Sequence, residues 1–156
     1  MYELLLLRHA HAEPAMAGGD DFERPLSAAG RSAALEVARQ LDAQQWRPER
    51  TLYSPARRAA DTAALVCDAL KLDHTSRQAL APLYLAKPGV LRAQLKAHHD
   101  GAHRLMIVGH NPGLSEWGVQ LSDALAGQSL ATAKYWHIAL DPSEWQRRVL
   151  TGRRGA

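Results

Sequence analysis

Near the start of the chain, Leu4-Leu5-Leu6-Leu7-Arg8-His9 places four apolar residues directly before two basic ones. A short apolar run that ends in polar residues is typical of a β-strand buried on both faces, as in parallel sheets. The run is far shorter than the roughly 20 apolar residues of a membrane span, and it lacks the core of a signal peptide. We therefore expect a central strand that ends at Arg8-His9, and neither membrane insertion nor secretion.

Two later segments repeat this arrangement of a strand followed by a polar turn. Residues 50–53 predict a short strand, and Ser54-Pro55 follows them. Residues 104–109 (RLMIVG) predict another buried strand, followed by His110-Asn111-Pro112. Ser or Asn before Pro favours an N-cap followed by the first position of a helix. Each of these strands is therefore expected to lead into a helix.

Amphipathic segments separate the predicted strands. Residues 12–25 hold two prolines, two glycines and several acids, which indicates a loop, and Ser27 then offers an N-cap. Residues 88–97 predict a shorter helix. Apolar positions at helical spacing define the buried faces of the other three helices. These positions are Ala34, Val37, Ala38 and Leu41, then Ala59, Ala63, Val66 and Leu70 with Cys67 beside them, and finally Leu114, Trp117, Leu121 and Leu125.

The alternation of strands and helices predicts an α/β fold with a mainly parallel central sheet and helices on both faces, because each parallel return needs a crossover helix. Residues 134–140 and 145–150 predict a closing hairpin around the turn at 141–143. We expect a single domain over residues 1–156, with residues 147–156 as a mobile basic tail.

The composition is that of an ordinary soluble domain. The chain has 156 residues, of which 46% are hydrophobic and 22% charged, and this argues against disorder or a fibrous repeat. Its net charge of +3 is too small to indicate nucleic-acid binding, and its four tryptophans are dispersed. Cys67 is the only cysteine, so no intrachain disulfide can form, and we expect a reducing, cytoplasmic location.

The carboxyl ends of the three predicted strands carry basic residues. Parallel strands end at one edge of the sheet, where α/β proteins bind ligands, so Arg8, His9, Arg58 and His110 should converge there. Guanidinium groups and helix N-termini favour anions. Each motif alone is weak, because surface arginines and histidines are common, but their coincidence predicts a phosphate site.

Only one of the two adjacent arginines after the second strand can face that site, because neighbours on a helix point about 100° apart. Arg57 has Asp61 four residues later, which suits a solvent-exposed ion pair. Arg58 is therefore the better candidate for the pocket.

These motifs together resemble the histidine phosphatase superfamily, also called the phosphoglycerate mutase-like fold. The resemblance rests on Leu-Leu-Arg8-His9-Ala10, on Arg24-Pro25-Leu26-Ser27 with Gly30, on Ser54-Pro55-x-x-Arg58-Ala59-x-x-Thr62, and on Gly109-His110-Asn111-Pro112. It covers roughly residues 2–140, and the order, spacing and short length are most similar to the SixA-type phosphohistidine phosphatase branch.

The resemblance implies a catalytic role for each matching residue. His9 would be the nucleophile and would carry the phosphoryl group transiently. Arg8, Arg58 and His110 would bind the phosphoryl oxygens, and Arg24 could reach them from the loop. This chemistry depends on positioning and electrostatics, and a neutral imidazole is a competent nucleophile near pH 7. It implies no cofactor and no metal, and a phosphohistidine-bearing protein as substrate.

The chain departs from the family pattern at two places. Ala10 stands where most members have glycine after the Arg-His pair. Members that hydrolyse phosphate esters usually carry a glutamate proton donor after the second helix, but between residues 72 and 101 the only acids here are Asp73 and Asp100. An alkoxide leaving group needs a general acid, worth about 10²- to 10⁴-fold in rate, whereas an imidazole leaves close to neutrality. The missing acid therefore favours the P–N bond of phosphohistidine, unless Asp20, Asp21 or Glu116 takes its place.

Three other functions fit parts of the sequence. A small-molecule phosphatase could act on a phosphosugar or nucleotide with an acid from residues 12–25. A non-catalytic module could bind a phosphorylated partner, although it would not need a nucleophile such as His9. A metallohydrolase is suggested by His9 and His11 and by the histidines at residues 98–103, but these lack carboxylates at ordered spacing.

Overall fold

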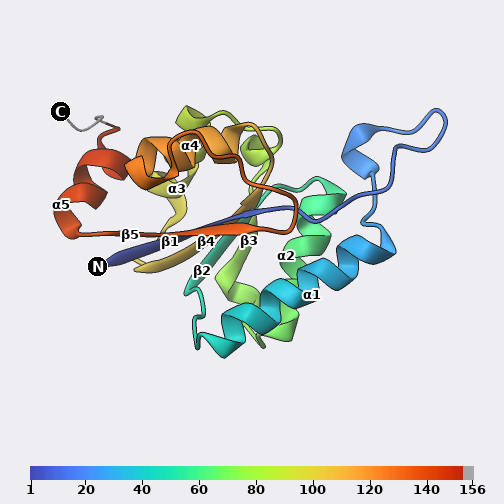
Figure 1. Cartoon of the computed structure of the whole chain (residues 1–156), viewed down its shortest axis with the longest axis horizontal. Coiled ribbons are helices and arrows are strands. Elements are labelled where there is room, and N and C mark those ends of the chain that lie inside the picture. Colours follow the sequence, from blue (N-terminus) through green and yellow to red (C-terminus); the bar gives the residue numbers. More distant parts are fainter. Residues whose placement is uncertain (153–156) are drawn as a thin grey trace.

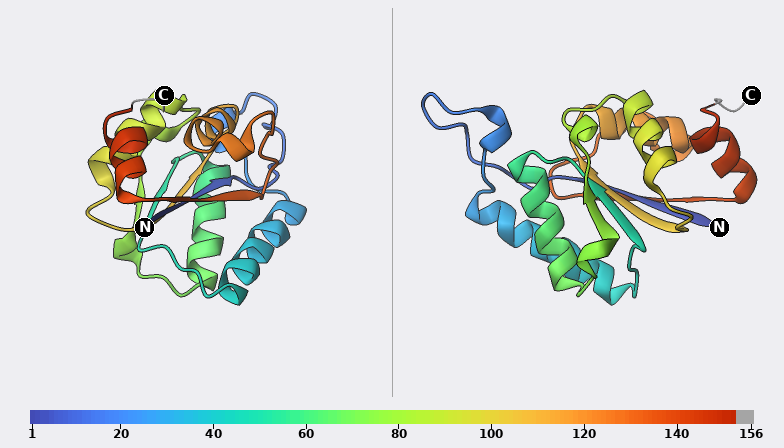
Figure 2. Two further views of the ribbon diagram at one scale, coloured as in Figure 1. Left: turned by 60° about the vertical axis from the view of Figure 1, so that its left-hand side comes forward. Right: turned by 180° about the vertical axis from the view of Figure 1, so that it is seen from behind.

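A five-stranded sheet lies between two layers of helices in the computed structural model, which describes residues 1–152 (Figures 1 and 2). The strand order is β3-β2-β4-β1-β5. The strands are β1 (Tyr2–Arg8), β2 (Arg50–Tyr53), β3 (Arg77–Ala79), β4 (Arg104–Gly109) and β5 (Tyr135–Leu140). All neighbouring pairs are parallel except β1 and β5, which are antiparallel. The predicted α/β class and mainly parallel sheet are confirmed.

The apolar run of β1 is buried on both faces because successive side chains of a strand point to opposite sides. Leu4 and Leu6 belong to one core cluster, and Leu5 and Leu7 belong to the other. All four leucines are fully buried. An alternating pattern of apolar and polar residues would have placed polar side chains in one of the two cores. A central strand therefore requires an uninterrupted apolar run.

Each face of the sheet is covered by its own set of helices (Figure 1). The helices α1 (Ala28–Ala43) and α2 (Arg57–Ala69) pack on one face, with the core cluster that contains Leu5. On the other face lie α3 (Pro88–His98), α4 (Gly113–Leu121), α5 (Pro142–Glu144) and η5 (Trp145–Leu150). Four short 3-10 helices complete the fold: η1 (Asp21–Glu23), η2 (His74–Ser76), η3 (Ala81–Leu83) and η4 (Asp123–Leu125).

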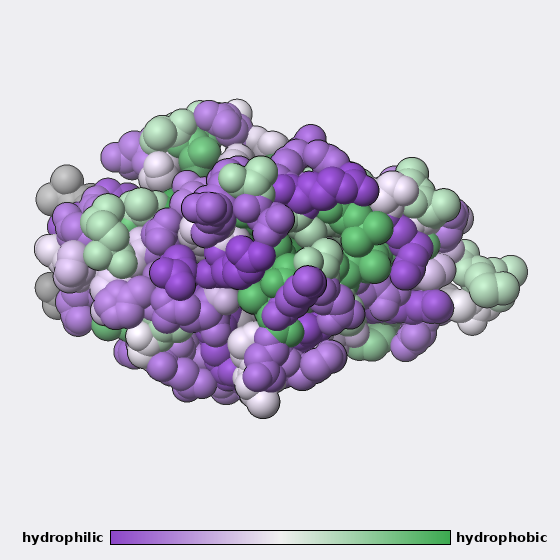
Figure 3. Space-filling model, turned by 90° about the horizontal axis from the view of Figure 1, so that it is seen from below, coloured by the Kyte–Doolittle hydropathy of each residue, from purple (hydrophilic) through white to green (hydrophobic). Residues whose placement is uncertain are grey.

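The helices present polar side chains to solvent. Seen from below, the molecule is mainly hydrophilic, with apolar side chains gathered near the centre and right of the view and in smaller patches elsewhere (Figure 3). Within residues 1–152, no helix is long and apolar enough to cross a membrane.

Two helices begin later than the sequence predicts. The helix after β2 starts at Arg57 instead of Pro55, and Ala56 occupies its N-cap without a side-chain hydrogen bond. The helix after β4 starts at Gly113 instead of Pro112. Ser54 and Asn111 still accept hydrogen bonds from nearby backbone amides, those of Ala56 and Ser115. Neither Ser54 nor Asn111 is therefore the N-cap residue of its helix, and both lie close behind the end of a strand, at the edge of the sheet.

The predicted closing hairpin and the basic tail are wrong over the described residues. Residues 145–150 form the π-helix η5 instead of a strand, and Asp141 and Glu144 form a capping box that starts the preceding α5. Trp145 and Val149 are buried in the core, and the Arg148 Nη1 donates to the Leu121 carbonyl oxygen at 2.6 Å. The tail therefore does not start at residue 147, and its last four residues, 153–156, lie outside the described part of the chain.

Candidate active site

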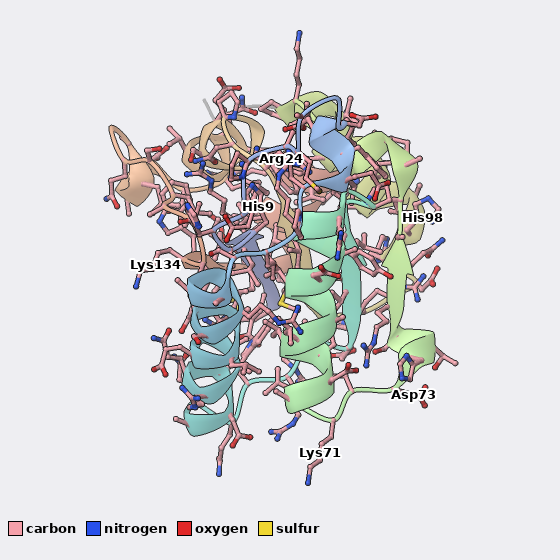
Figure 4. All side chains as sticks on the ribbon, turned by 90° about the vertical axis from the view of Figure 1, so that its right-hand side faces the viewer. His9, Arg24, Lys71, Asp73, His98 and Lys134 are labelled. Carbon is pink, nitrogen blue, oxygen red and sulfur yellow. The ribbon has the colours of Figure 1, made fainter. Side chains whose placement is uncertain are left out.

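The carboxyl ends of β1, β2 and β4 lie side by side because β4 pairs with both other strands, through Arg8 with Gly109 and Tyr53 with Val108. A cavity of about 340 Å³ lies at this edge of the sheet. Figure 4 shows His9 and Arg24 at this end of the molecule, far from Lys71 and Asp73 at the other. The cavity is lined by Arg8, His9, His11, Ala12, Arg24, Arg58, Leu85, His110, Asn111 and Thr132. The structure therefore brings all five site residues expected from the sequence into one cavity.

His9 is held in a single tautomer by the backbone. Its Nδ1 lies 2.8 Å from the carbonyl oxygen of Ala10, which can only accept, so Nδ1 carries the hydrogen and donates it. The Nε2 atom then keeps its lone pair. Burial, together with the charges of Arg58 and Arg8, lowers the pKa of His9 to about 4. The imidazole is therefore neutral, with a free lone pair, at neutral pH.

The methyl group of Ala10 packs into the core and does not line the cavity. Ala10 is fully buried and belongs to the core cluster beneath α1 and α2. Its N–H donates to the Thr62 Oγ1 at 3.0 Å, and the Thr62 hydroxyl donates to the Arg58 carbonyl oxygen at 2.7 Å. The residue that replaces the usual glycine thus packs inward and connects β1 to the first turn of α2.

The two neighbouring arginines of α2 have different environments. The side chain of Arg58 is only 4% exposed and lines the cavity, whereas that of Arg57 is 53% exposed and lies 3.8 Å from the Asp61 carboxylate. Arg8 also lines the cavity, with its Nη1 donating to the Leu130 carbonyl oxygen at 3.1 Å. Arg24 reaches the cavity from the loop before α1, where its Nε donates to the Glu13 carbonyl oxygen at 2.9 Å.

His110 faces His9, and their ring centroids are 5.2 Å apart. The His110 Nε2 lies 2.8 Å from the Ser54 Oγ, and its Nδ1 is buried without a hydrogen-bond partner among the described residues. Burial, followed by the proximity of His9 and Arg58, lowers the pKa of His110 to about 3. The cavity therefore combines two neutral imidazoles with three arginines, which is an arrangement suited to a phosphoryl group.

A family model agrees with this arrangement. The model of the histidine phosphatase superfamily (branch 1) matches residues 4–87, which include most of β1 with its Arg8-His9 end and all of α2. The chain belongs to the histidine phosphatase superfamily. It is therefore an enzyme, a phosphatase.

Individual relatives support the assignment of this histidine phosphatase. An uncharacterized protein of Picosynechococcus sp. is 31% identical over 140 residues, which cover 88% of this chain and 84% of that protein. A SixA structure from Agrobacterium tumefaciens is 26% identical, with a TM-score of 0.79 over 87% of this chain and 90% of that one. The protein histidine phosphatase SixA complexed with tungstate is also 26% identical, with a TM-score of 0.77 over 91% and 90% of the two chains. The chain is thus similar to the SixA-type branch.

Asp21 was considered from the sequence only as a substitute acid, but this histidine phosphatase uses it as an acceptor for its neighbours. The Arg58 Nη2 donates to its Oδ2 at 3.1 Å, the Arg24 Nη1 donates to its Oδ1 at 3.2 Å, and the Tyr84 hydroxyl donates to its Oδ2 at 2.6 Å. These contacts, led by that of Tyr84, lower the pKa of Asp21 to about 2. Asp21 is therefore an ionised carboxylate at neutral pH, and it does not line the cavity.

The other two acids considered from the sequence are also placed away from this role. Asp20 caps η1 by accepting from the Phe22 N–H at 3.1 Å. Glu116 lies on α4 and lines a different, larger cavity of about 730 Å³, which shares only Asn111 with the first. Among residues 1–152, no aspartate or glutamate lines the smaller cavity.

The histidines that suggested a metal site have other contacts. His11 accepts from or donates to the Ser27 Oγ at 2.8 Å, His103 stacks on Tyr2, and His99 packs edge-on against Trp145. In the described part of the chain, no three His, Cys, Asp or Glu side chains are grouped so that they could hold a metal ion.

Sequence reasoning missed two residues that contact the site, Ser54 and Tyr84. The sequence indicates Ser54 as a helix cap and as part of the Ser54-Pro55-x-x-Arg58 motif, but not as a partner of His110, because that contact depends on β2 and β4 being neighbours in the sheet. Tyr84 has no local sequence signal, because its contacts to Asp21 and His110 join segments far apart in the chain.

Proposed function

We propose that this protein is a phosphohistidine phosphatase that hydrolyses the P–N bond of a phosphohistidine side chain through a covalent phospho-His9 intermediate. Membership of the superfamily supports phosphatase chemistry, and the similarity to SixA supports this substrate class. The observation that carries the proposal is the cavity itself, in which a neutral imidazole faces cationic side chains and no carboxylic acid is present among the described lining residues.

In the first step, the lone pair of the His9 Nε2 attacks the phosphorus atom of the substrate. The P–N bond of the substrate breaks, and its electron pair stays on the departing imidazole nitrogen. In the second step, water attacks phospho-His9, the new P–N bond breaks, and inorganic phosphate leaves with His9 restored. The hydrogen bond from the His9 Nδ1 to the Ala10 carbonyl keeps the ring oriented during both steps.

The arginines act on the charge of the phosphoryl group. Phosphoryl transfer spreads charge over three equatorial oxygens, so Arg8, Arg58 and His110 would stabilise it through fixed donors in a mainly buried site. Arg24 lies at the exposed side of the cavity and is assigned a supporting contact. The Arg58 guanidinium is already oriented by Asp21, so it loses little side-chain freedom when the phosphoryl group binds.

The absence of a general acid distinguishes between leaving groups. An imidazole whose second ring nitrogen is protonated departs as a neutral molecule, whereas an alkoxide must receive a proton as it leaves. Asp21 is ionised, with its pKa lowered to about 2, and like Asp20 and Glu116 it does not line the cavity. On this basis we propose that the enzyme cleaves phosphoramidates faster than alkyl phosphates.

We also propose a protein substrate in the cytoplasm. The only cysteine, Cys67, is buried and unpaired, and burial raises the pKa of its thiol, so it gives no sign of adaptation to an oxidising compartment. The cavity beside His9 lies at the carboxyl edge of the sheet, where a phosphohistidine side chain on another protein would have to enter.

The test compares kcat/KM for a phosphohistidine peptide, an aryl phosphate and an alkyl phosphate, with chelator-treated wild type beside His9→Ala. We expect the phosphohistidine peptide to exceed the alkyl phosphate by at least about 100-fold, because a general acid contributes 10²- to 10⁴-fold. His9→Ala should have no turnover, and mass spectrometry of quenched wild type should find the phosphoryl group on His9.

Other results would overturn parts of the proposal. Equal or faster cleavage of the alkyl phosphate would reveal a general acid and favour a small-molecule phosphatase. Substantial turnover by His9→Ala would remove His9 as the nucleophile. Binding of all three compounds without turnover would identify a phosphate-binding module.

A further inference from the structure

Ser54, the first residue after β2, contacts His110, the first residue after β4. Its side chain is completely buried, and its Oγ lies 2.8 Å from the His110 Nε2. The same Oγ accepts a hydrogen bond from the Ala56 N–H at 3.2 Å. The two contacts differ in kind, because an amide can only donate, whereas a ring nitrogen can donate or accept according to its tautomer.

The hydroxyl hydrogen of Ser54 has only one acceptor within the described residues. It cannot be given to the Ala56 amide, and a fully buried hydroxyl without an acceptor carries a desolvation cost. The remaining partner is the His110 Nε2, which accepts only when it bears no hydrogen. A neutral ring must then carry its hydrogen on Nδ1.

The other nitrogen of the ring agrees with this assignment. The His110 Nδ1 is buried and has no hydrogen-bond partner among residues 1–152, in a ring that is 3% exposed and lines the phosphoryl cavity. A buried donor without a partner is costly unless a ligand satisfies it. Burial, followed by the proximity of His9 and Arg58, lowers the pKa of this ring and keeps it uncharged.

We infer that Ser54 is a positioning residue, whose hydroxyl donates to the His110 Nε2 and so fixes the Nδ1–H tautomer that donates to the bound phosphoryl group. The inference rests on the proposed function for the identity of the ligand, but the tautomer belongs to the resting protein. Both histidines then carry their hydrogen on Nδ1, but the two rings use their nitrogens differently. His9 turns its Nδ1–H to the Ala10 carbonyl and keeps Nε2 as nucleophile, whereas His110 accepts at Nε2 and donates from Nδ1.

The first measurement is the tautomer of His110 in the ligand-free wild type, from long-range ¹H–¹⁵N correlation spectra of ¹⁵N-histidine-labelled protein at pH 7. The His110→Asn variant identifies the signals. We expect the pattern of a ring protonated at Nδ1. A ring protonated at Nε2 would overturn the inference without any variant of Ser54, and so this test does not depend on whether such a variant folds.

The second measurement uses Ser54→Ala, with Thr51→Val as the control. Both changes remove a fully buried hydroxyl from the same strand region, but the Thr51 hydroxyl contacts the Cys67 sulfur and not the cavity. In Ser54→Ala we expect the Nε2–H tautomer of His110 to predominate and the tungstate affinity to fall by roughly tenfold, because the affinity falls with the fraction of rings that carry the donor hydrogen on Nδ1. Thr51→Val should keep the wild-type tautomer and affinity.

Two results would contradict the inference: an unchanged His110 tautomer in Ser54→Ala, or equal losses of tungstate affinity in both variants. Failure of the proposed function has a different signature. If the wild type shows the Nδ1–H tautomer and the Ser54 effect on tungstate, but cleaves no phosphohistidine, then the positioning role stands and the substrate assignment fails.

Discussion

The side chains of Arg57 and Arg58 are adjacent in sequence, yet only that of Arg58 lines the cavity beside His9. Arg58 places both terminal nitrogens against Asp21, with Nη1 donating to the carbonyl oxygen at 2.9 Å and Nη2 to the carboxylate at 3.1 Å. Its Nε is buried and has no partner among the described residues. The guanidinium is therefore oriented by one acidic residue and retains a donor for a ligand.

We predict that Arg58→Ala lowers kcat/KM for the phosphohistidine peptide by about 10²- to 10³-fold, the usual effect of losing one fixed donor to a developing anion. Arg57→Ala is the matched control and should stay within about twofold of wild type, because its partner Asp61 is a neighbour on the helix surface. Arg58→Lys should recover little activity, since an ammonium cannot reproduce the planar fork. Steady-state kinetics would check this, and equal losses in the two alanine variants would contradict the assignment of Arg58.

At the scale of elements, the first turn of α1 holds the segment that follows His9. Ser27 caps α1 by accepting from the Gly30 N–H at 2.9 Å, and its own N–H donates to the His11 carbonyl oxygen at 3.0 Å. A Cβ atom on Gly30 would overlap that same carbonyl oxygen, whereas a Cβ atom on Gly89 in α3 would meet nothing within 4 Å. The close approach of α1 to His11 therefore requires glycine at position 30.

We predict that Gly30→Ala destabilises the protein by about 2 kcal/mol, the typical cost of overpacking against backbone. The midpoint of thermal unfolding should fall by about 4 to 8 °C. Gly89→Ala should be neutral or stabilising by up to about 1 kcal/mol, because alanine is the better helix former at an open position. Circular dichroism would measure both midpoints, and equal stability of the two variants would show that α1 does not need its close contact with His11.

The elements also show what the sequence could and could not predict. The strands β1 and β4 were predictable because uninterrupted apolar runs lead directly into polar turns. The three-residue β3 (Arg77–Ala79) was missed because it is too short and too polar to show a period. For η5, the turn residues at 141–143 favoured a hairpin with a strand over residues 145–150, but the Asp141-Pro142-x-Glu144 capping box is a helix start signal and was the stronger evidence.

At the scale of the whole molecule, the site depends on the strand order. β1 and β4 are separated by about a hundred residues of chain, yet they are neighbours in the sheet, with β2 on the far side of β4. Sequence motifs could name His9, Arg58 and His110 as candidates, because each follows a strand. The contacts that orient them, from Ser54 and Asp21, cross between strands and loops and could not be read from spacing.

Assembly of this site also gives the folded molecule a pH dependence. The pKa values of His9 and His110 are lowered from 6.5 to about 4 and about 3, mainly by burial. Between pH 6.5 and these values, the unfolded chain binds more protons than the folded protein. The free energy of unfolding must therefore fall as the pH falls through this window, and the full contribution is present above pH 6.5. Asp21, with its lowered pKa, acts in the same direction between its ordinary value and about 2.

We predict that acidification from pH 7 to pH 4.5 costs the wild type on the order of 5 kcal/mol through these two rings, since each ring loses nearly two units of its pKa shift over this range and one unit corresponds to about 1.4 kcal/mol. The double variant His9→Asn, His110→Asn retains polar side chains but cannot titrate in this range. Its free energy of unfolding should therefore change less than that of the wild type between pH 7 and pH 4.5. Urea unfolding at a series of pH values would measure both slopes. Parallel slopes would mean that the buried rings are not held neutral, and the free lone pair of His9, on which the proposed nucleophilic step depends, would then be lost in mildly acidic solution.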